Sequence, residues 1–172
     1  NSIFSELLFK VYKKKIIQTF NKPILVIGSE KLIKSQMKLL NYSIKIKKHR
    51  SDNIKNIKIN NNFINIIDVN YNFNKVFDKI TKSSKLYINN CFKLALNLLK
   101  KNLASSLING PVSKEHFLER KYLGVTEYLA KNTNIKKKPT MLIYNPSFSV
   151  CPVTTHVPIL KVSKHLTKNK II

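Results

Sequence analysis

Apolar residues recur along this chain with two different spacings. A spacing of three to four positions predicts helices, and short apolar or alternating stretches predict strands. The predicted helices cover residues 5–15, 29–40, 83–101, 113–121 and 126–134. The predicted strands cover residues 24–27, 42–48, 63–69, 105–110, 141–144 and 148–153. Ser5, Ser29 and Ser113 stand where three of the helices should begin, and serine is a favoured helix cap.

Strands alternate with helices over most of the length, and this alternation predicts the fold class. We expect an α/β fold with a mostly parallel sheet that is flanked by helices on both faces. The last two predicted strands form a hairpin-like pair around an Asn-Pro-Ser turn. In sheets of this class, ligands bind beyond the carboxyl ends of the strands. Two such ends carry conspicuous chemistry, in the segments "SLINGPVSK" and "VCPVTTH".

The charge balance of the chain is strongly basic. Lysine and arginine outnumber aspartate and glutamate by 32 to 8, which gives a formal net charge of +24. One interpretation is a nucleic-acid or anionic-membrane partner. We favour a compositional origin instead, because isoleucine, asparagine and lysine dominate the chain and all three have A/T-rich codons. The lysines form only short runs, at residues 13–15 and 136–138, and no aromatic residues are interleaved with them as in single-strand binding faces.

The two cysteines and the absence of long apolar stretches indicate the compartment. Cys91 and Cys151 are too few and too far apart for a disulfide framework or a zinc knuckle, so we expect both to be core thiols. The sequence has no apolar stretch of membrane-spanning length and no signal peptide. We therefore expect a cytoplasmic protein with no membrane partner. Because the chain opens on Asn1 rather than Met, we also expect it to be part of a longer protein.

One histidine follows a predicted strand end. His156 has the hydroxyl groups of Thr154 and Thr155 before it and Pro158 after it. A neutral imidazole can bind a divalent metal. A lone histidine is more often structural, however, and no metal-motif spacing occurs elsewhere in the chain. If His156 binds a metal, its co-ligands come from outside this sequence or from a second subunit.

Two further segments stand at predicted helix starts. "NGPVSK" places Lys114 just after Ser113, where an ammonium and backbone N–H groups could meet a phosphate. The alternative is a simple strand-to-helix turn. "LGVTEYLA" places Thr126 and Glu127 at a helix start, where the alternative is capping by Thr126 with Glu127 favoured by the helix dipole. Three glycines are too few for an ordinary Rossmann or P-loop phosphate site.

Four segments together resemble one known family. "INGPVSKEHF", "YLGVTEYLAKNTN", "MLIYNP" and "VCPVTTHVPI" occur in this order and spacing in the 4-hydroxythreonine-4-phosphate dehydrogenases of the vitamin B6 pathway. The segment "PILVIGSEKLIKSQMKLL" is similar to a strand and a helix of the same family. The resemblance covers nearly the whole chain as an N-terminal portion, is strong over residues 109–159 and is weak over residues 41–77.

The resemblance implies a fold like that of isocitrate and isopropylmalate dehydrogenases, incomplete in this chain. It divides the chain into residues 1–105, the N-terminal α/β portion of a first domain, and residues 106–172, the start of a dimer-forming, metal-binding portion. It implies a homodimeric enzyme that uses NAD or NADP to oxidise 4-phosphohydroxy-L-threonine to a β-keto acid. That acid then loses CO2 to give 3-amino-2-oxopropyl phosphate. A divalent metal (zinc, magnesium or cobalt) is held by three histidines.

The same resemblance assigns roles to particular residues. His156 is the first metal ligand, and the other two lie beyond residue 172. The family's His-Thr substrate pair is Val125 and Thr126 here, so Thr126 matches and Val125 does not. Lys114 is a candidate phosphate or carboxylate contact. Because most cofactor contacts would also lie downstream, we expect this chain to be inactive alone. The alternatives are a non-catalytic relative that lost the histidine at position 125, and a basic nucleic-acid-binding α/β protein.

Overall fold

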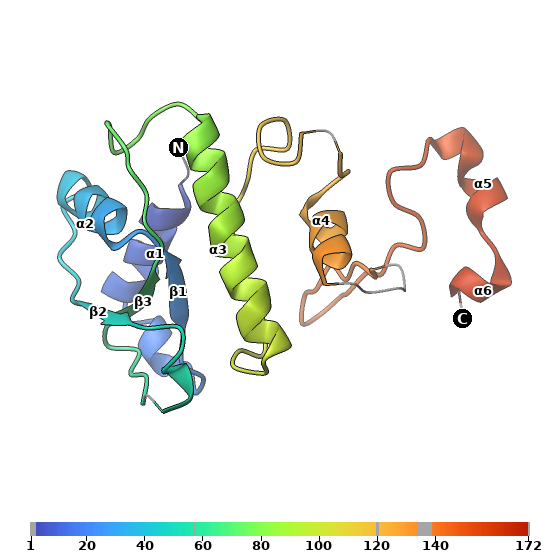
Figure 1. Cartoon of the computed structure of the whole chain (residues 1–172). Coiled ribbons are helices and arrows are strands. Elements are labelled where there is room, and N and C mark those ends of the chain that lie inside the picture. Colours follow the sequence, from blue (N-terminus) through green and yellow to red (C-terminus); the bar gives the residue numbers. More distant parts are fainter. Residues whose placement is uncertain (1–2, 57, 120, 134–138, 172) are drawn as a thin grey trace. The chain divides into compact units, whose positions relative to one another are not determined.

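The computed structural model describes residues 3–56, 58–119, 121–133 and 139–171. The chain forms two compact units, Asn1–Phe117 and Leu118–Ile172, and every named strand lies in the first unit (Figure 1). The strands are β1 (Leu25–Gly28), β2 (Ile46–His49) and β3 (Ile64–Asp68). The helices of this unit are α1 (Phe4–Lys13), α2 (Glu30–Leu39) and α3 (Lys82–Lys100), with the short 3-10 helices η1 (Ile17–Thr19) and η2 (Ile54–Asn56). The predicted division at residue 105 concerns the domains of a longer protein and stays a prediction.

The strands form a single parallel sheet in the order β1-β3-β2. Strand β3 therefore lies in the centre and pairs with both neighbours. Because all strands run in the same direction, their carboxyl ends meet at one edge of the sheet. The residues at that edge are Gly28, His49 and Asp68. The predicted fold class, an α/β fold with a parallel sheet flanked by helices, is confirmed.

The two faces of the sheet carry separate cores, because successive side chains of a strand point to opposite faces. Ile64 and Ile66 of β3 belong to a cluster that includes Phe9 of α1 and residues of α2. Ile67 points to the other face and packs with Leu98 of α3. Figure 1 shows the same arrangement, with α1 and α2 on one side of the sheet and α3 on the other. Helices on both faces thus bury the central strand.

The buried residue Asn65 interrupts this apolar strand without leaving a polar atom unpaired. Its Nδ2 donates to the carbonyls of Asn60 at 2.8 Å and Phe63 at 3.0 Å. Because carbonyls only accept, this orientation turns Oδ1 toward His49, whose Nε2 lies 2.9 Å away and must carry the proton. His49 is itself buried, although lysines and an arginine surround it in the sequence. The amide thereby joins β3 to β2 and to the loop before β3.

The helix starts were predicted with mixed success. The Ser29 hydroxyl accepts a hydrogen bond from the Leu32 N–H at 3.3 Å, which confirms Ser29 as the cap of α2. The predicted cap Ser5 is wrong, because α1 begins one residue earlier and Ser5 lies inside its first turn. Helix α3 begins after Thr81, which forms a reciprocal capping box with Ser84.

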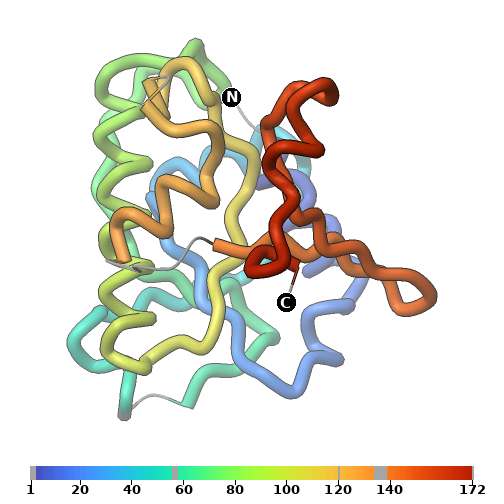
Figure 2. The backbone as a smooth tube through the Cα atoms, turned by 90° about the vertical axis from the view of Figure 1, so that its right-hand side faces the viewer, coloured from blue at the N-terminus to red at the C-terminus, as the bar shows by residue number. Residues whose placement is uncertain are grey.

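The second unit contains short helices and very little strand. Its elements are α4 (Val125–Asn132), η3 (Ile159–Lys161), α5 (Val162–His165) and α6 (Lys168–Ile171). The predicted hairpin at residues 141–153 is present as one antiparallel bridge between Ile143 and Val150, and Figure 2 shows the chain doubling back there. None of the helices in the described residues combines the length and the apolar character needed to cross a membrane.

Two predicted elements in residues 105–121 are wrong. Residues 105–110 form no strand, and Ile108 is 78% exposed. A strand needs a neighbour for its backbone hydrogen bonds, and none of the described residues pairs with this segment. The described part of residues 113–121 forms hydrogen-bonded turns instead of a helix. The predicted end of a helix at residue 134 lies outside the described residues.

The three helices of the first unit end in the same way, with a residue in the left-handed backbone conformation. These residues are Lys15, Asn41 and Asn102, each with φ of 56°. The residue after each one donates its N–H to a carbonyl five positions back, in the bonds Ile16 to Val11, Tyr42 to Met37 and Leu103 to Leu98. This is the Schellman pattern, in which glycine is the usual left-handed residue. Here non-glycine residues hold that conformation.

Replacing Lys15 with glycine is expected to raise the free energy of unfolding by about 1 kcal/mol. A non-glycine residue in this conformation costs about 1–2 kcal/mol, and the extra freedom of glycine in the unfolded chain offsets part of that gain. Asn102→Gly should gain less, because asparagine tolerates the left-handed region. Urea denaturation measures both variants. Lys14→Gly is the matched control, since Lys14 has φ of −77° and should lose stability. A destabilised Lys15→Gly variant would show that the left-handed backbone of Lys15 is not strained.

Candidate functional site

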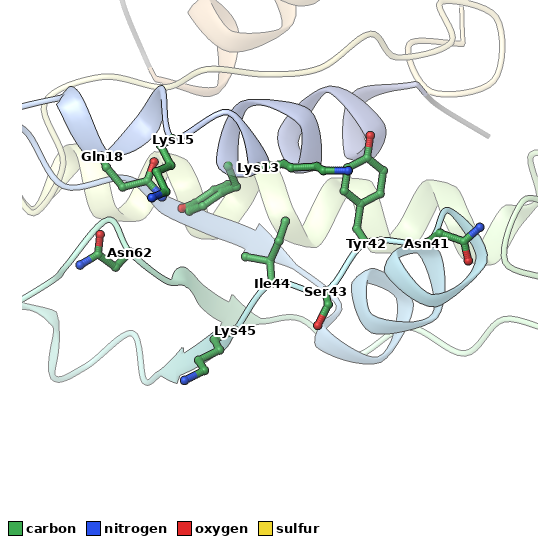
Figure 3. A pocket seen from close by; sticks show the side chains of 10 residues that line it. Lys13, Lys15, Gln18, Asn41, Tyr42, Ser43, Ile44, Lys45 and Asn62 are labelled. Atoms are coloured by element: carbon green, nitrogen blue, oxygen red, sulfur yellow. The ribbon is translucent and has the colours of Figure 1, made fainter.

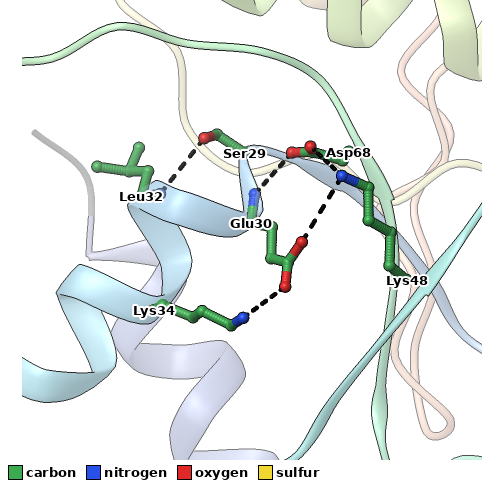
Figure 4. A network of polar contacts seen from close by, with 6 residues as sticks. All are labelled: Ser29, Glu30, Leu32, Lys34, Lys48 and Asp68. Carbon is green, nitrogen blue, oxygen red and sulfur yellow. Dashed lines mark hydrogen bonds and ion pairs between the residues drawn. The ribbon is translucent and has the colours of Figure 1, made fainter.

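The edge of the sheet where parallel strands end is occupied by a network around Asp68 (Figure 4). Asp68 is the last residue of β3 and lies opposite Gly28 of β1. Its Oδ1 accepts the backbone N–H of Glu30 at 2.9 Å, so this carboxylate completes the start of α2 beside the cap Ser29. Its Oδ2 accepts from Lys48 Nζ of β2 at 2.6 Å. The Asp68 carboxylate therefore joins both α2 and β2 to the central strand β3.

The charges in this network balance. Glu30 forms an ion pair with Lys34 at 2.6 Å and lies 3.7 Å from the same Lys48 that bonds Asp68. Two carboxylates and two ammonium groups thus compensate each other. Because these four charges pair with one another, the network stabilises this edge of the sheet and none of the four is left for a ligand. Sequence reasoning missed it, although the aspartate at the end of the predicted strand 63–69 was a usable signal.

The network lowers the pKa of the Asp68 carboxyl. Burial alone would raise this pKa, but the hydrogen bonds from Lys48 and from the Glu30 N–H, together with the Lys48 charge, outweigh it. The same Asp68 hydrogen bond raises the pKa of Lys48. Asp68 is therefore ionised throughout the neutral range and contributes to stability only while it stays ionised.

Tyr87 of α3 lies next to the start of α2, and Cys91 is close to Tyr87 in the sequence of α3. The Tyr87 hydroxyl accepts the N–H of Ser29 at 2.8 Å, and its ring stacks on Tyr71 with centroids 4.6 Å apart. Burial raises the pKa of the Cys91 thiol to about 11, so it is not a reactive thiolate at neutral pH. Cys91 is half-buried, close to its expected role as a core thiol, whereas Cys151 is exposed and its predicted burial is wrong.

The predicted substrate residues are Lys114, in a turn, and Val125 and Thr126, at the start of α4. Lys114 of the first unit is exposed in the turn that follows Ser113, whose carbonyl and hydroxyl hold that turn together. Val125 and Thr126 of the second unit are half-buried in the first turn of α4. Gly124 is the N-cap of α4 and supplies no side-chain hydrogen bond, so the reading of Thr126 as the cap is wrong. Glu127 does lie in the first turn, as expected for the helix dipole.

His156 lies in a bend of the second unit, with φ of 57°, and its side chain is exposed. No strand ends beside it, because the predicted strand 148–153 is reduced to the bridge at Val150. Its imidazole makes no hydrogen bond within the described part of the chain, so the ring is available to an outside partner. Within the described residues, no three His, Cys, Asp or Glu side chains lie close enough together to hold a metal.

Comparison with known proteins decides the family. The sequence profile described as "Pyridoxal phosphate biosynthetic protein PdxA" matches residues 19–172. The chain belongs to this family. It is similar to the 4-hydroxythreonine-4-phosphate dehydrogenase of Sulfurihydrogenibium sp. (strain YO3AOP1), with 31% identity over 174 residues that cover 100% of this chain and 52% of the relative. The enzyme of the same name from Wigglesworthia glossinidia brevipalpis is 32% identical over 111 residues, which cover 63% of this chain and 33% of the relative.

Solved structures of the family share the fold. The 4-hydroxythreonine-4-phosphate dehydrogenase of Burkholderia phymatum matches with a TM-score of 0.84 at 21% identity, covering 99% of this chain and 51% of that structure. The enzyme of the same name from Klebsiella pneumoniae matches with a TM-score of 0.76 at 20% identity, covering 99% and 51%. The chain therefore spans about half the length of these PdxA-family proteins.

Asp68→Asn is expected to make the first unit less stable at pH 7, by about 1 kcal/mol or less, because pairs this exposed are weak. A lowered folded-state pKa gives stability that is present above the unfolded pKa, near 3.8, and is lost as the pH falls through the folded value. The difference between wild type and variant should therefore disappear in strong acid. Urea denaturation between pH 7 and pH 2 measures it. A difference that is independent of pH would show that the Asp68 charge does not act through this network.

Proposed function

We propose that this chain is the N-terminal portion of an NAD- or NADP-dependent 4-hydroxythreonine-4-phosphate dehydrogenase. The observation that carries the proposal is the family match over residues 19–172, which contains the segments "NGPVSK", "GVTEYLA" and "TTHVP". The proposed substrate is 4-phosphohydroxy-L-threonine. Its secondary alcohol loses a hydride to the nicotinamide ring and a proton to the medium. The resulting β-keto acid releases CO2 and leaves 3-amino-2-oxopropyl phosphate.

The start of α4 is the proposed substrate contact. The first N–H groups of a helix have no intrahelical acceptor, and Gly124 provides no side-chain cap for them. Such a helix start favours an anionic group, and the Thr126 hydroxyl adds a donor that carries no charge. Val125 stands where the family has histidine and offers no hydrogen bond. Val125 is the first residue of α4 and is only half-buried, so packing of the core does not require valine at this position. The replacement of histidine by valine therefore changes the chemistry offered to the substrate.

Besides the start of α4 and the Thr126 hydroxyl, we propose Lys114 as a substrate contact, because its side chain is charged and exposed. Its ammonium makes no ion pair within the described residues, so it is free to meet a phosphate or carboxylate of the substrate. Lys114 lies in the first unit and Thr126 in the second.

His156 is the proposed first ligand of a divalent metal, zinc, magnesium or cobalt. A bound metal would stabilise negative charge on the substrate alcohol oxygen. The described residues supply one exposed imidazole and do not form a metal site by themselves, so the remaining ligands must come from elsewhere. The role of His156 in this proposal is to coordinate the metal through one ring nitrogen, and most of the cofactor contacts likewise lie outside this chain.

The exposed apolar side chains around His156 support a partner in the assembled enzyme. None of residues 139–171 is buried, and Phe148, Ile159 and Leu160 are 75%, 87% and 90% exposed. Apolar surface of this kind marks protein interfaces. In the proposed enzyme this segment packs against the rest of a longer polypeptide and against the second subunit of a homodimer. A cytoplasmic location belongs to the same proposal.

A polypeptide that extends this chain to the length of its relatives is expected to oxidise 4-phosphohydroxy-L-threonine with NAD or NADP. It should also hold one divalent metal per chain. The 172-residue chain alone should show no turnover, because it lacks most of the cofactor and metal contacts. His156→Ala in the longer polypeptide should weaken metal affinity by about 100-fold or more, measured by metal analysis and zinc titration.

His165→Ala is the matched control, because His165 is an exposed histidine of the same unit, on α5. This variant should keep its metal. Turnover by the 172-residue chain, or full metal affinity in His156→Ala, would overturn the assignment of roles. A longer polypeptide that binds metal but not the substrate would identify the non-catalytic relative instead.

A further inference from the structure

A basic pocket opens at the opposite edge of the sheet, near the amino ends of the strands (Figure 3). It has a volume of about 470 Å³ and lies entirely within the first unit. Its walls come from the end of α1, from η1 and from the segments before β2 and β3, where Lys45 and Asn62 lie. A volume of this size suits a small organic molecule.

The charge of this pocket has one sign. Lys13, Lys15 and Lys45 line it, and no aspartate or glutamate does. None of these three ammonium groups forms an ion pair within the described residues. Lys13 Nζ lies 5.7 Å from the centre of the Tyr42 ring, which forms part of the wall. Three uncompensated cations beside one hollow favour an anion.

Two buried polar atoms of wall residues have no hydrogen-bond partner among the described residues. Tyr12 is only 3% exposed, and its hydroxyl is one of these two atoms. The Gln18 Oε1 is also buried and unpaired. An unpaired buried polar group costs about 1–3 kcal/mol, so such groups are rare unless a ligand or water satisfies them. Burial raises the Tyr12 pKa to about 12, so the hydroxyl keeps its proton at neutral pH and can donate.

The loop around the pocket is held in place before any ligand arrives. The Asn61 side chain donates to the carbonyls of Ile17, Phe20 and Lys22 at 3.0–3.3 Å and accepts the N–H of Ile24 at 2.9 Å. These bonds fix the segment that carries Gln18. The Schellman ends of α1 and α2 fix the backbone of the opposite wall. A preorganised pocket loses little entropy when it binds.

We propose that this pocket binds a small organic phosphate. The lysine ammonium groups donate hydrogen bonds to the phosphate oxygens. A small side-chain shift in the wall uncovers the buried Tyr12 hydroxyl and Gln18 Oε1, which then pair with a phosphate oxygen and with a hydroxyl group of the ligand. The pocket lies at the amino ends of the strands, and its ligand is independent of the proposed dehydrogenase function. Nucleic acid fits less well, because an enclosed phenol hydroxyl reaches one phosphate group and the wall offers no row of aromatic rings.

Glycerol 3-phosphate is a suitable probe, titrated into the 172-residue chain by calorimetry at constant ionic strength. We expect saturable binding with one ligand per chain and competition by inorganic phosphate. Tyr12→Phe should weaken binding about tenfold, as expected for the loss of one hydrogen bond to a charged group. Lys45→Gln should weaken it to a similar extent. Lys47→Gln is the matched control, because Lys47 is an exposed lysine two positions away that does not line the pocket, and its affinity should stay within about twofold of wild type.

Thermal unfolding separates a binding role of Tyr12 from a packing role. Without ligand, Tyr12→Phe should unfold at the same or a higher temperature than wild type, since it removes an unpaired buried hydroxyl. With glycerol 3-phosphate its stabilisation should be smaller than that of wild type. Wild-type affinity in Tyr12→Phe, or equal weakening by Lys45→Gln and Lys47→Gln, would overturn the proposal and indicate diffuse charge attraction. Binding of a short single-stranded DNA but not of glycerol 3-phosphate would also overturn it.

Discussion

Burial of β3 on both faces is the constraint on which the rest of the first unit depends. Ile64, Ile66 and Ile67 each contribute about 1.5–3 kcal/mol when they leave water. The exposed ion pairs at the edge of the sheet contribute at most about 1 kcal/mol each. The helices therefore take their places because they cover the two faces of this strand. The bonds of Asn65 and Asp68 then fix which neighbours the strand has and where the helices begin.

Local features of the fold could be predicted from the sequence, and contacts between distant residues could not. The cap Ser29 and the strand around Ile66 depend on neighbouring residues, so their patterns are visible in the sequence. The bonds from Asn65 to His49 and from Asp68 to Lys48 join residues 16 and 20 positions apart, and no spacing rule encodes them. The strand predicted at residues 105–110 failed for a related reason, because an apolar pattern cannot show whether a partner strand exists.

The family was recognised from motifs of the sequence, and the profile match over residues 19–172 confirms it. The roles of Thr126 and His156, which rest on the same motifs, stay predictions. A metal or substrate site needs several groups at once, however, and the chain spans about half of its relatives. The pocket around Tyr12 was invisible in the sequence, because a tyrosine with helical spacing reads as an ordinary core residue. Only its unpaired hydroxyl distinguishes it.

The first unit has a core of its own around β3, whereas none of residues 139–171 is buried. Amide hydrogen exchange of the 172-residue chain measures this difference, because protection reports local opening free energy. We expect the slowest exchange at Ile66 and Ile67, and exchange close to that of an unfolded peptide for most amides of residues 139–171. Comparable protection of both segments, or rapid exchange in β3, would contradict this expectation.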